Sequence, residues 1–195
     1  MPVTNALIQN SSSALKIPSV NRLQPPRDVT STFLDNMRLP VHRWFRYSAG
    51  FSAQWVSKLI ESNDYGRKSV VLDPFVGSGT TMLASESAGV KAYGIESHPF
   101  VARIAKAKLF YRTDSNSYTE FAGKVLKHSE CINGKPDFYP KLIRKCFTDE
   151  ALKTLDCLRQ SWEKHRDASP ASELTWLTLV SILRSVSHVG TAPWK

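Results

Sequence analysis

Short apolar runs in the middle of the chain alternate with a glycine turn and helical spacing. The run 69–73 is apolar, ends in Asp73 and leads into the turn 74–81, which predicts a strand and a strand-to-helix turn. A helix is expected over 81–87, with Gly89 as its C-terminal stop. A second strand over 91–95 ends in Glu96. This strand–helix–strand order predicts the beginning of a doubly wound parallel sheet.

Helical spacing dominates the rest of the pattern. His98-Pro99 opens a helix to about Lys108, with Phe100, Ile104 and Leu109 expected on its inner face and Arg103, Lys106 and Lys108 outside. Ser52 is the predicted N-cap of a helix that carries Trp55, Val56, Leu59 and Ile60. Three further helices are expected: one after a capping box at 117–120, one opening at Asp149-Glu150, and one after Ser169-Pro170. The fold class is therefore α/β, with an incomplete sheet and a helical C-terminal portion.

Three segments follow from this pattern. Residues 1–37 are rich in Ser and Asn, contain Pro25-Pro26, and are expected to form a flexible N-terminal arm. Residues 38–112 form the predicted α/β unit, and residues 113–195 the helical segment. The N-terminus has no leader pattern and no apolar run approaches the length of a membrane span, so we expect no membrane association and a cytoplasmic location.

The net positive charge of the chain bears on the kind of partner it binds. Lys and Arg number 26 against 17 Asp and Glu, a formal net charge of +9, which favours a nucleic acid, although many basic proteins bind none. Arg43 and Arg46 lie in an aromatic and basic stretch, residues 38–51. That stretch is equally typical of a nucleic-acid contact and of a packed edge. The three cysteines and the histidines lack metal-ligand spacing, so no metal is expected and the cysteines are interpreted as buried apolar residues.

The glycine turn and the two acids indicate a nucleoside cofactor. Gly77 and Gly79 allow close backbone approach, and Glu96 is suited to ribose hydroxyls. Met82 replaces the third glycine of a dinucleotide fingerprint, and no phosphate loop is present, which disfavours a pyrophosphate. S-adenosylmethionine fits better, because Asp73 can take its ammonium group and the turn 77–81 its carboxylate. The alternative is a tight turn without a ligand.

Residues 73–80 read Asp-Pro-Phe-Val-Gly-Ser-Gly-Thr, which closely resembles the cofactor motif of the DNA amino-methyltransferase family. The resemblance implies a Rossmann-like methyltransferase sheet with S-adenosylmethionine as cofactor. It also implies that Glu96 binds the ribose and that Phe51 and Ser52 help hold the methionine end. The implied cofactor-binding residues are Asp73, Pro74, Phe75, Gly77, Ser78, Gly79, Thr80, Glu96, Phe51 and Ser52.

The family's catalytic tetrapeptide does not occur in the sequence. It consists of Asp, Asn or Ser, then Pro-Pro, then an aromatic residue, which together orient the target amine and stack on a flipped base. Residues 24–27, Gln-Pro-Pro-Arg, and 192–195, Ala-Pro-Trp-Lys, match it only in part. We therefore assign no catalytic residue and expect a truncated or split domain, with a second polypeptide as the possible source of the catalytic half.

The predicted function is the cofactor-binding portion of a DNA methyltransferase of a restriction-modification system. Such an enzyme transfers a methyl group to N4 of cytosine or N6 of adenine. Two alternatives stay open: an RNA amino-methyltransferase, since a similar turn occurs in enzymes that modify structured RNA, and a non-catalytic module that binds S-adenosylmethionine or DNA.

Overall fold

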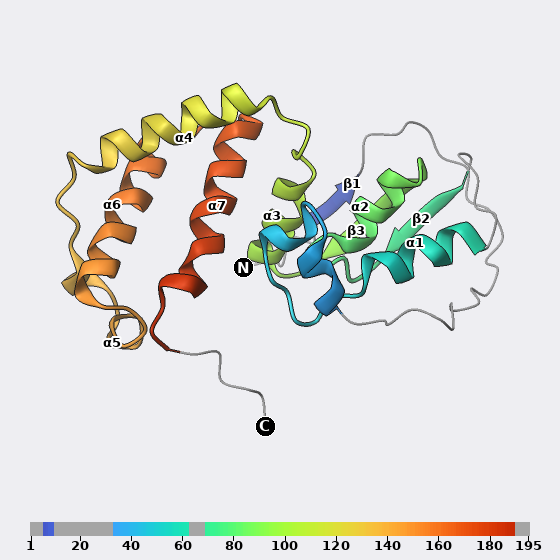
Figure 1. Ribbon diagram of the computed structural model, residues 1–195, viewed down its shortest axis with the longest axis horizontal. Helices are drawn as coiled ribbons and strands as arrows, with labels where there is room; N and C mark the ends of the chain where they lie inside the picture. Colours follow the sequence, from blue (N-terminus) through green and yellow to red (C-terminus); the bar gives the residue numbers. More distant parts are fainter. Residues whose placement is uncertain (1–5, 10–32, 63–68, 190–195) are drawn as a thin grey trace. The chain divides into compact units, whose positions relative to one another are not determined.

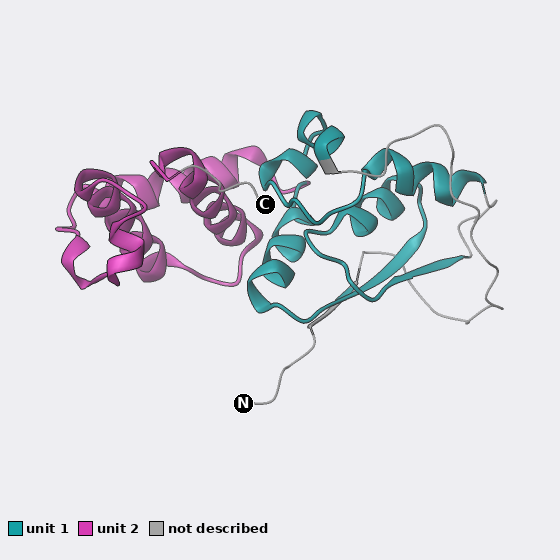
Figure 2. Cartoon of the chain, turned by 90° about the horizontal axis from the view of Figure 1, so that it is seen from below, with its two compact units in different colours: residues 1–111 teal, residues 112–195 magenta. Residues whose placement is uncertain are grey.

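The computed structural model describes residues 6–9, 33–62 and 69–189. It comprises two compact units, residues 1–111 and residues 112–195, which are described separately (Figure 2). The functional division into arm, cofactor unit and helical segment stays a prediction. Most of the predicted arm lies outside the described residues.

A three-stranded mixed sheet organises the first unit (Figure 1). Its strands are β1 (Ala6–Gln9), β2 (Val70–Asp73) and β3 (Lys91–Glu96), in the order β1-β3-β2. Strands β2 and β3 are parallel, with Asp73 opposite Gly94. Because parallel strands end at the same edge, the acids at the ends of β2 and β3 lie at one edge of the sheet.

Helices cover one face of this sheet. They are α1 (Ala53–Ser62), α2 (Thr80–Ser87) and α3 (Pro99–Lys108), preceded by the 3₁₀ turns η1 (Phe33–Arg38) and η2 (His42–Trp44). One apolar cluster contains Ile8, Val76, Met82, Ala92, Ala102 and Ala105. A second contains Val56, Ile60, Ala84 and Val90, and Val71 packs against both. Leu72, which points to the opposite face, is 63% exposed.

Strand β1 corrects one expectation. It pairs antiparallel with β3, so the described sheet is mixed rather than wholly parallel. It also lies inside the segment 1–37, whose role as an arm stays a prediction. Four residues are too few for alternation to be recognised, and the flanking Asn and Ser residues favoured a loop. The pairing partner, β3, begins more than eighty residues later in the chain.

The predicted faces of α3 were partly wrong. Lys108 was expected outside but is 1% exposed, and Phe100 was expected inside but is 41% exposed. Helical periodicity reports the side of a helix that faces the sheet. It does not reveal that the segment containing η2 also packs over α3, where the ammonium group of Lys108 meets the carbonyl of His42.

The second unit is helical. Its long helices are α4 (Ser115–Ser129), α6 (Asp149–His165) and α7 (Pro170–Val186), which pack pairwise, and η3 (Pro136–Phe138) and α5 (Lys141–Arg144) connect α4 to α6. The core contains Val125, Leu152, Cys157, Trp162, Ala171, Leu174 and Leu177. No helix in the described part of the chain is long and apolar enough to cross a membrane.

Two local expectations for this unit need correction. The cap of α4 is Asp114, whose carboxylate accepts a hydrogen bond from the Ser117 N–H at 2.9 Å, and not the predicted box beginning at Ser117. An aspartate just before a helix caps as well as a serine, and it adds one turn here. Of the free cysteines only Cys157 is buried, whereas Cys131 is exposed.

Candidate cofactor site

Asp73 ends β2, and one of its carboxylate oxygens lacks a hydrogen-bond partner among the described residues. The residue is 8% exposed, and its Oδ1 accepts a hydrogen bond from the Phe75 N–H at 2.9 Å. Its Oδ2 is buried and has no hydrogen-bond partner among the described residues. A buried carboxylate oxygen without a partner is costly, and a cationic or hydrogen-bond-donating ligand group would remove that cost.

The turn after Asp73 is hydrogen-bonded to β3 and within itself. The Val76 N–H donates to the Ile95 carbonyl at 3.1 Å, and the Gly79 N–H donates to the Val76 carbonyl at 3.0 Å. Gly77 and Gly79 have φ values of 52° and 90°, which favour glycine. A Cβ on Gly79 would lie 3.2 Å from the Cβ of Ala105, so this glycine lets the turn approach α3.

Glu96 connects the end of β3 to the turn. Its Oε2 accepts the Gly77 N–H at 3.0 Å, and its Oε1 accepts the His98 N–H at 2.9 Å. Each oxygen of a carboxylate has two lone pairs, so each can accept one further hydrogen bond. The two sequence-predicted acids therefore both bind the backbone of the turn and its flanks.

The remaining residues of the motif differ in exposure. Ser78 and Thr80 are 2% and 4% exposed, and the Ser78 hydroxyl is a second buried group without a partner among the described residues. Pro74 is exposed, and Phe75 is 81% exposed. The turn thus exposes the Phe75 ring to solvent, whereas its polar residues Ser78 and Thr80 are buried.

Phe51 and Ser52 precede α1. The Ser52 hydroxyl accepts a hydrogen bond from the Trp55 N–H at 3.4 Å, as a helix cap does, and the residue is fully buried. The Phe51 ring is 43% exposed and packs at 6.0 Å from that of Trp55. These contacts explain their positions, and their role toward a cofactor stays a prediction.

Asn36, which the sequence pattern did not single out, holds this segment. It is fully buried, its amide nitrogen donates to the Phe51 carbonyl at 2.7 Å, and its oxygen accepts the Ala53 N–H at 2.7 Å. The two bonds fix the entry into α1 from a segment 15 and 17 residues earlier. A lone Asn in an unpatterned stretch gives no sequence signal for this role.

Tyr47 was also missed as a site residue. A Cβ on Gly77 would lie 2.9 Å from Cε1 of Tyr47, so the ring lies directly against the turn. Burial, and then the negative charge of Glu96, raise the pKa of the Tyr47 hydroxyl. Tyr47 therefore lies near both Gly77 and Glu96. Its only sequence signal was its membership of the aromatic and basic stretch that contains Arg43 and Arg46.

That stretch is part packed and part exposed. Arg43 and Arg46 are exposed, whereas the ring of Phe45, between them, meets the ring of Phe100 edge-on at 6.1 Å. The aromatic residue Phe45 therefore packs while the two arginines are exposed, and a nucleic-acid role for the arginines stays a prediction.

The turn can lie close to β3 only because residue 94 is a glycine. A Cβ at this position would come 2.7 Å from Cγ2 of Val76 and 3.1 Å from the sulfur of Met82. The turn and α2 therefore pack directly on the backbone of β3.

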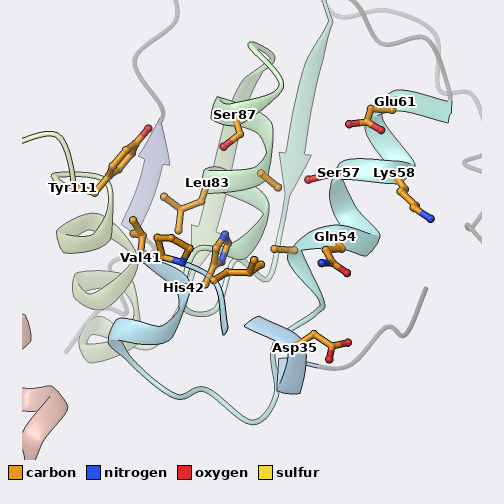
Figure 3. Close-up of a pocket in the computed structure, with 14 residues that line it drawn as sticks. Asp35, Val41, His42, Gln54, Ser57, Lys58, Glu61, Leu83, Ser87 and Tyr111 are labelled. Atoms are coloured by element: carbon orange, nitrogen blue, oxygen red, sulfur yellow. The ribbon is translucent and has the colours of Figure 1, made fainter. Parts of the chain in front are cut away.

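A separate groove of about 920 Å³ lies in the first unit, between the η1–η2 segment and helices α1 and α2 (Figure 3). It is lined by Asp35, Val41, His42, Gln54, Leu83 and Tyr111, among others, and not by Asp73, Gly77 or Glu96. In the described part of the chain, no three or more His, Cys, Asp or Glu side chains gather closely enough to hold a metal ion.

The described residues thus form a parallel strand pair joined by a glycine turn and a helix, with Asp73 at the end of the first strand and Glu96 hydrogen-bonded to the turn. The family model described as DNA methylase matches residues 7–107, more than half of the chain. The chain belongs to this DNA methylase family.

Relatives agree with this assignment. The chain is 41% identical to the type II methyltransferase M.BsoBI of Geobacillus stearothermophilus over 155 residues, which cover 78% of this chain and 30% of that protein. It is 39% identical to M.AvaI of a Nostoc strain over 79 residues, 40% of this chain and 16% of the relative. The chain thus spans less than a third of the length of these relatives. No solved structure matches it significantly.

Proposed function

We propose that this chain is the S-adenosylmethionine-binding portion of a DNA methyltransferase that modifies an exocyclic amine, N4 of cytosine or N6 of adenine. The observation that carries the proposal is the buried Oδ2 of Asp73, which has no partner in the described part of the chain and lies beside a glycine turn that is bonded to Glu96. Membership of the DNA methylase family supports the reaction class and the choice of DNA.

The residues suit the parts of S-adenosylmethionine. Asp73 would take the ammonium group, and the N-terminus of α2, behind the turn, would take the carboxylate. Glu96 retains the lone pairs needed for the two ribose hydroxyls. Phe51 and Ser52 would border the methionine end. When bound, the cofactor supplies an electrophilic methyl group. This chain's own residues would bind and orient it.

The fold part of the proposal is a Rossmann-like doubly wound sheet, of which β2 and β3 would be adjacent strands. The crossover through α2 between two parallel strands supports it. The exposure of Leu72 supports it as well, because parallel strands are normally covered on both faces. A strand face that the described residues leave exposed fits a sheet whose second face is covered by another stretch of polypeptide.

The substrate part of the proposal assigns Arg43 and Arg46 to the phosphates of duplex DNA. Both are exposed and lie close in sequence to Tyr47, which contacts the candidate site. Methyl transfer would also need the Asp/Asn/Ser-Pro-Pro-aromatic tetrapeptide, which is not in this sequence. In this proposal it comes from another stretch of polypeptide, such as a second chain.

Equilibrium dialysis of the folded chain with radiolabelled S-adenosylmethionine tests the cofactor. We expect saturable binding that S-adenosylhomocysteine displaces and that ATP and NAD do not, because the turn lacks a pyrophosphate site. Displacement by ATP or NAD, without displacement by S-adenosylhomocysteine, would contradict the cofactor assignment.

A methyl-transfer assay with the chain alone tests the reaction part. We expect no labelled product with duplex DNA, and none with tRNA. Transfer to DNA by the chain alone would show that the missing tetrapeptide is not needed. Transfer to tRNA would instead favour an RNA amino-methyltransferase.

A further inference from the structure

Lys108 is the largest fully buried side chain of the described residues, although it is charged in water. It ends α3, where it is 1% exposed, and its Nζ donates a hydrogen bond to the backbone carbonyl of His42 at 3.2 Å. The two residues are 66 positions apart in the sequence. The lysine therefore connects the end of α3 to the segment that leads into the candidate site.

The segment that Lys108 holds contains a strained turn. Val41 has φ 65° and ψ −51°, and the His42 N–H donates to the Pro40 carbonyl at 2.7 Å. This is the geometry of a γ-turn of the rarer, strained kind, which a β-branched residue adopts only when its surroundings impose it. The Lys108 hydrogen bond falls on the carbonyl directly after Val41, where it can impose that conformation.

The same segment continues to the glycine turn. Five residues after His42, the ring of Tyr47 lies against Gly77 and within the electrostatic reach of Glu96. Between them, Phe45 packs edge-on against Phe100 of α3. The segment 40–47 is thus attached to α3 at two points and reaches the turn at its far end.

Burying this lysine is costly to the fold. Burial lowers the pKa of Lys108 to about 7, which means that the surroundings disfavour the ammonium form. A methionine of similar length would fill the same space without that cost. Packing alone therefore does not explain why a lysine is buried here. The hydrogen bond that holds the His42 segment in position explains it better.

We propose that Lys108 is a positioning residue for the cofactor site: it fixes residues 40–47 so that the Tyr47 ring covers the glycine turn beside Glu96. This inference rests on the proposed S-adenosylmethionine site. In it, Tyr47 forms one wall of that site and Lys108 acts only through Tyr47.

The test compares S-adenosylmethionine affinity with thermal stability in the full chain. Lys108→Met should weaken binding by about tenfold, the scale of coupling through a shared backbone shift, while the melting temperature stays the same or rises. Lys106→Met, two residues earlier and exposed, is the matched control and should change neither. Unchanged affinity in Lys108→Met overturns the inference, and so does a loss of affinity accompanied by a lower melting temperature.

A double-mutant cycle with Tyr47→Ala measures the coupling between the two residues in cofactor affinity. A lysine with only a structural role would show no such coupling. If Lys108 acts through Tyr47, Lys108→Met should have little further effect on affinity in the Tyr47→Ala background. Multiplicative losses from the two substitutions would overturn the inference. Absence of cofactor binding by the folded wild-type chain would instead reject the proposed function, so the two failures can be distinguished.

Discussion

Asp73 and Glu96 differ in how their oxygens are used, and this decides what each substitution should do. Asp73 has a buried oxygen without a partner among the described residues, whereas both oxygens of Glu96 accept backbone N–H groups. A substitution of Asp73 should therefore change mainly the affinity for the ligand. A substitution of Glu96 should change both the affinity for the ligand and the stability of the turn.

Glu96→Gln should weaken S-adenosylmethionine binding by about 1.5–3 kcal/mol, the scale of a charge-assisted hydrogen bond. It replaces one acceptor oxygen with a donor, so it should also lower the melting temperature by loosening either Gly77 or His98. Calorimetric titration and thermal unfolding measure the two effects. Glu61→Gln, an exposed acid on α1, is the control. Wild-type affinity in Glu96→Gln would show that Glu96 does not hold the ribose.

Gly94→Ala should destabilise the first unit by about 1–3 kcal/mol, the cost of overpacking a well-packed core, because the new Cβ would meet Val76 at 2.7 Å. Gly123→Ala is the opposite control, since nothing lies within 4 Å of a Cβ there and the residue is inside α4. It should stabilise the second unit by about 0.5–1 kcal/mol. Denaturant unfolding followed by circular dichroism measures both. Equal stability of wild type and Gly94→Ala would contradict the close approach of the turn to β3.

Residues that act through local sequence were predictable, and residues that act across the chain were not. The cofactor motif identified Asp73 and Gly77, the following strand identified Glu96, and the structure brings the three together around one turn. Asn36 and Lys108 were missed because their partners lie far away in sequence, and a hydrogen bond to a distant backbone carbonyl leaves no pattern. The cofactor roles of the motif residues stay predictions.

At the scale of elements, strands and helices with strong local signals were predicted to within a few residues. The observed β2, α2 and α3 begin within one residue of their expected starts, because a glycine turn, a glycine stop and an N-terminal proline mark them. Strand β1 was not found, since its stability comes from pairing with β3 and not from its own four residues.

Asp156 stabilises the second unit through a hydrogen-bond network that should titrate. It is 2% exposed and accepts bonds from the Lys135 N–H, the Tyr139 hydroxyl, Arg159 and Gln160. Burial alone would raise its pKa, but these donors outweigh burial and lower the pKa to about 2. The folded pKa is below the unfolded value. The network's stabilisation is therefore complete above about pH 4 and is lost as pH falls toward 2.

Asp156→Asn should therefore lower the free energy of unfolding at pH 7 by about 2–3 kcal/mol, because an amide cannot accept all of these bonds. The difference from wild type should shrink as the pH falls from about 4 to about 2. Denaturant unfolding at a series of pH values measures this. Asp137→Asn is the control, because Asp137 is exposed and forms a surface ion pair with Arg144. A difference that does not depend on pH would contradict the network account.

At the scale of the whole molecule, the net charge of +9 and DNA methylase membership lead to one prediction about binding. Affinity for duplex DNA should fall linearly on a log–log plot against salt concentration, with a slope of about −0.9 per phosphate contacted. The double substitution Arg43→Gln with Arg46→Gln should reduce that slope by about 2. Arg144→Gln, whose guanidinium pairs with Asp137, should change it little. Fluorescence anisotropy at several salt concentrations measures the slope. An unchanged slope in the double variant would show that neither arginine contacts a DNA phosphate.

Calorimetric titration of the folded chain and its Asp73→Asn variant with S-adenosylmethionine tests the proposed cofactor site. We predict saturable binding by the wild type and a loss of about 1.5–3 kcal/mol in Asp73→Asn, with an unchanged melting temperature, because the carboxylate charge is needed for the ligand and not for the fold. No binding by the folded wild-type chain would reject the cofactor site, and equal binding by the two proteins would show that Asp73 does not hold the cofactor.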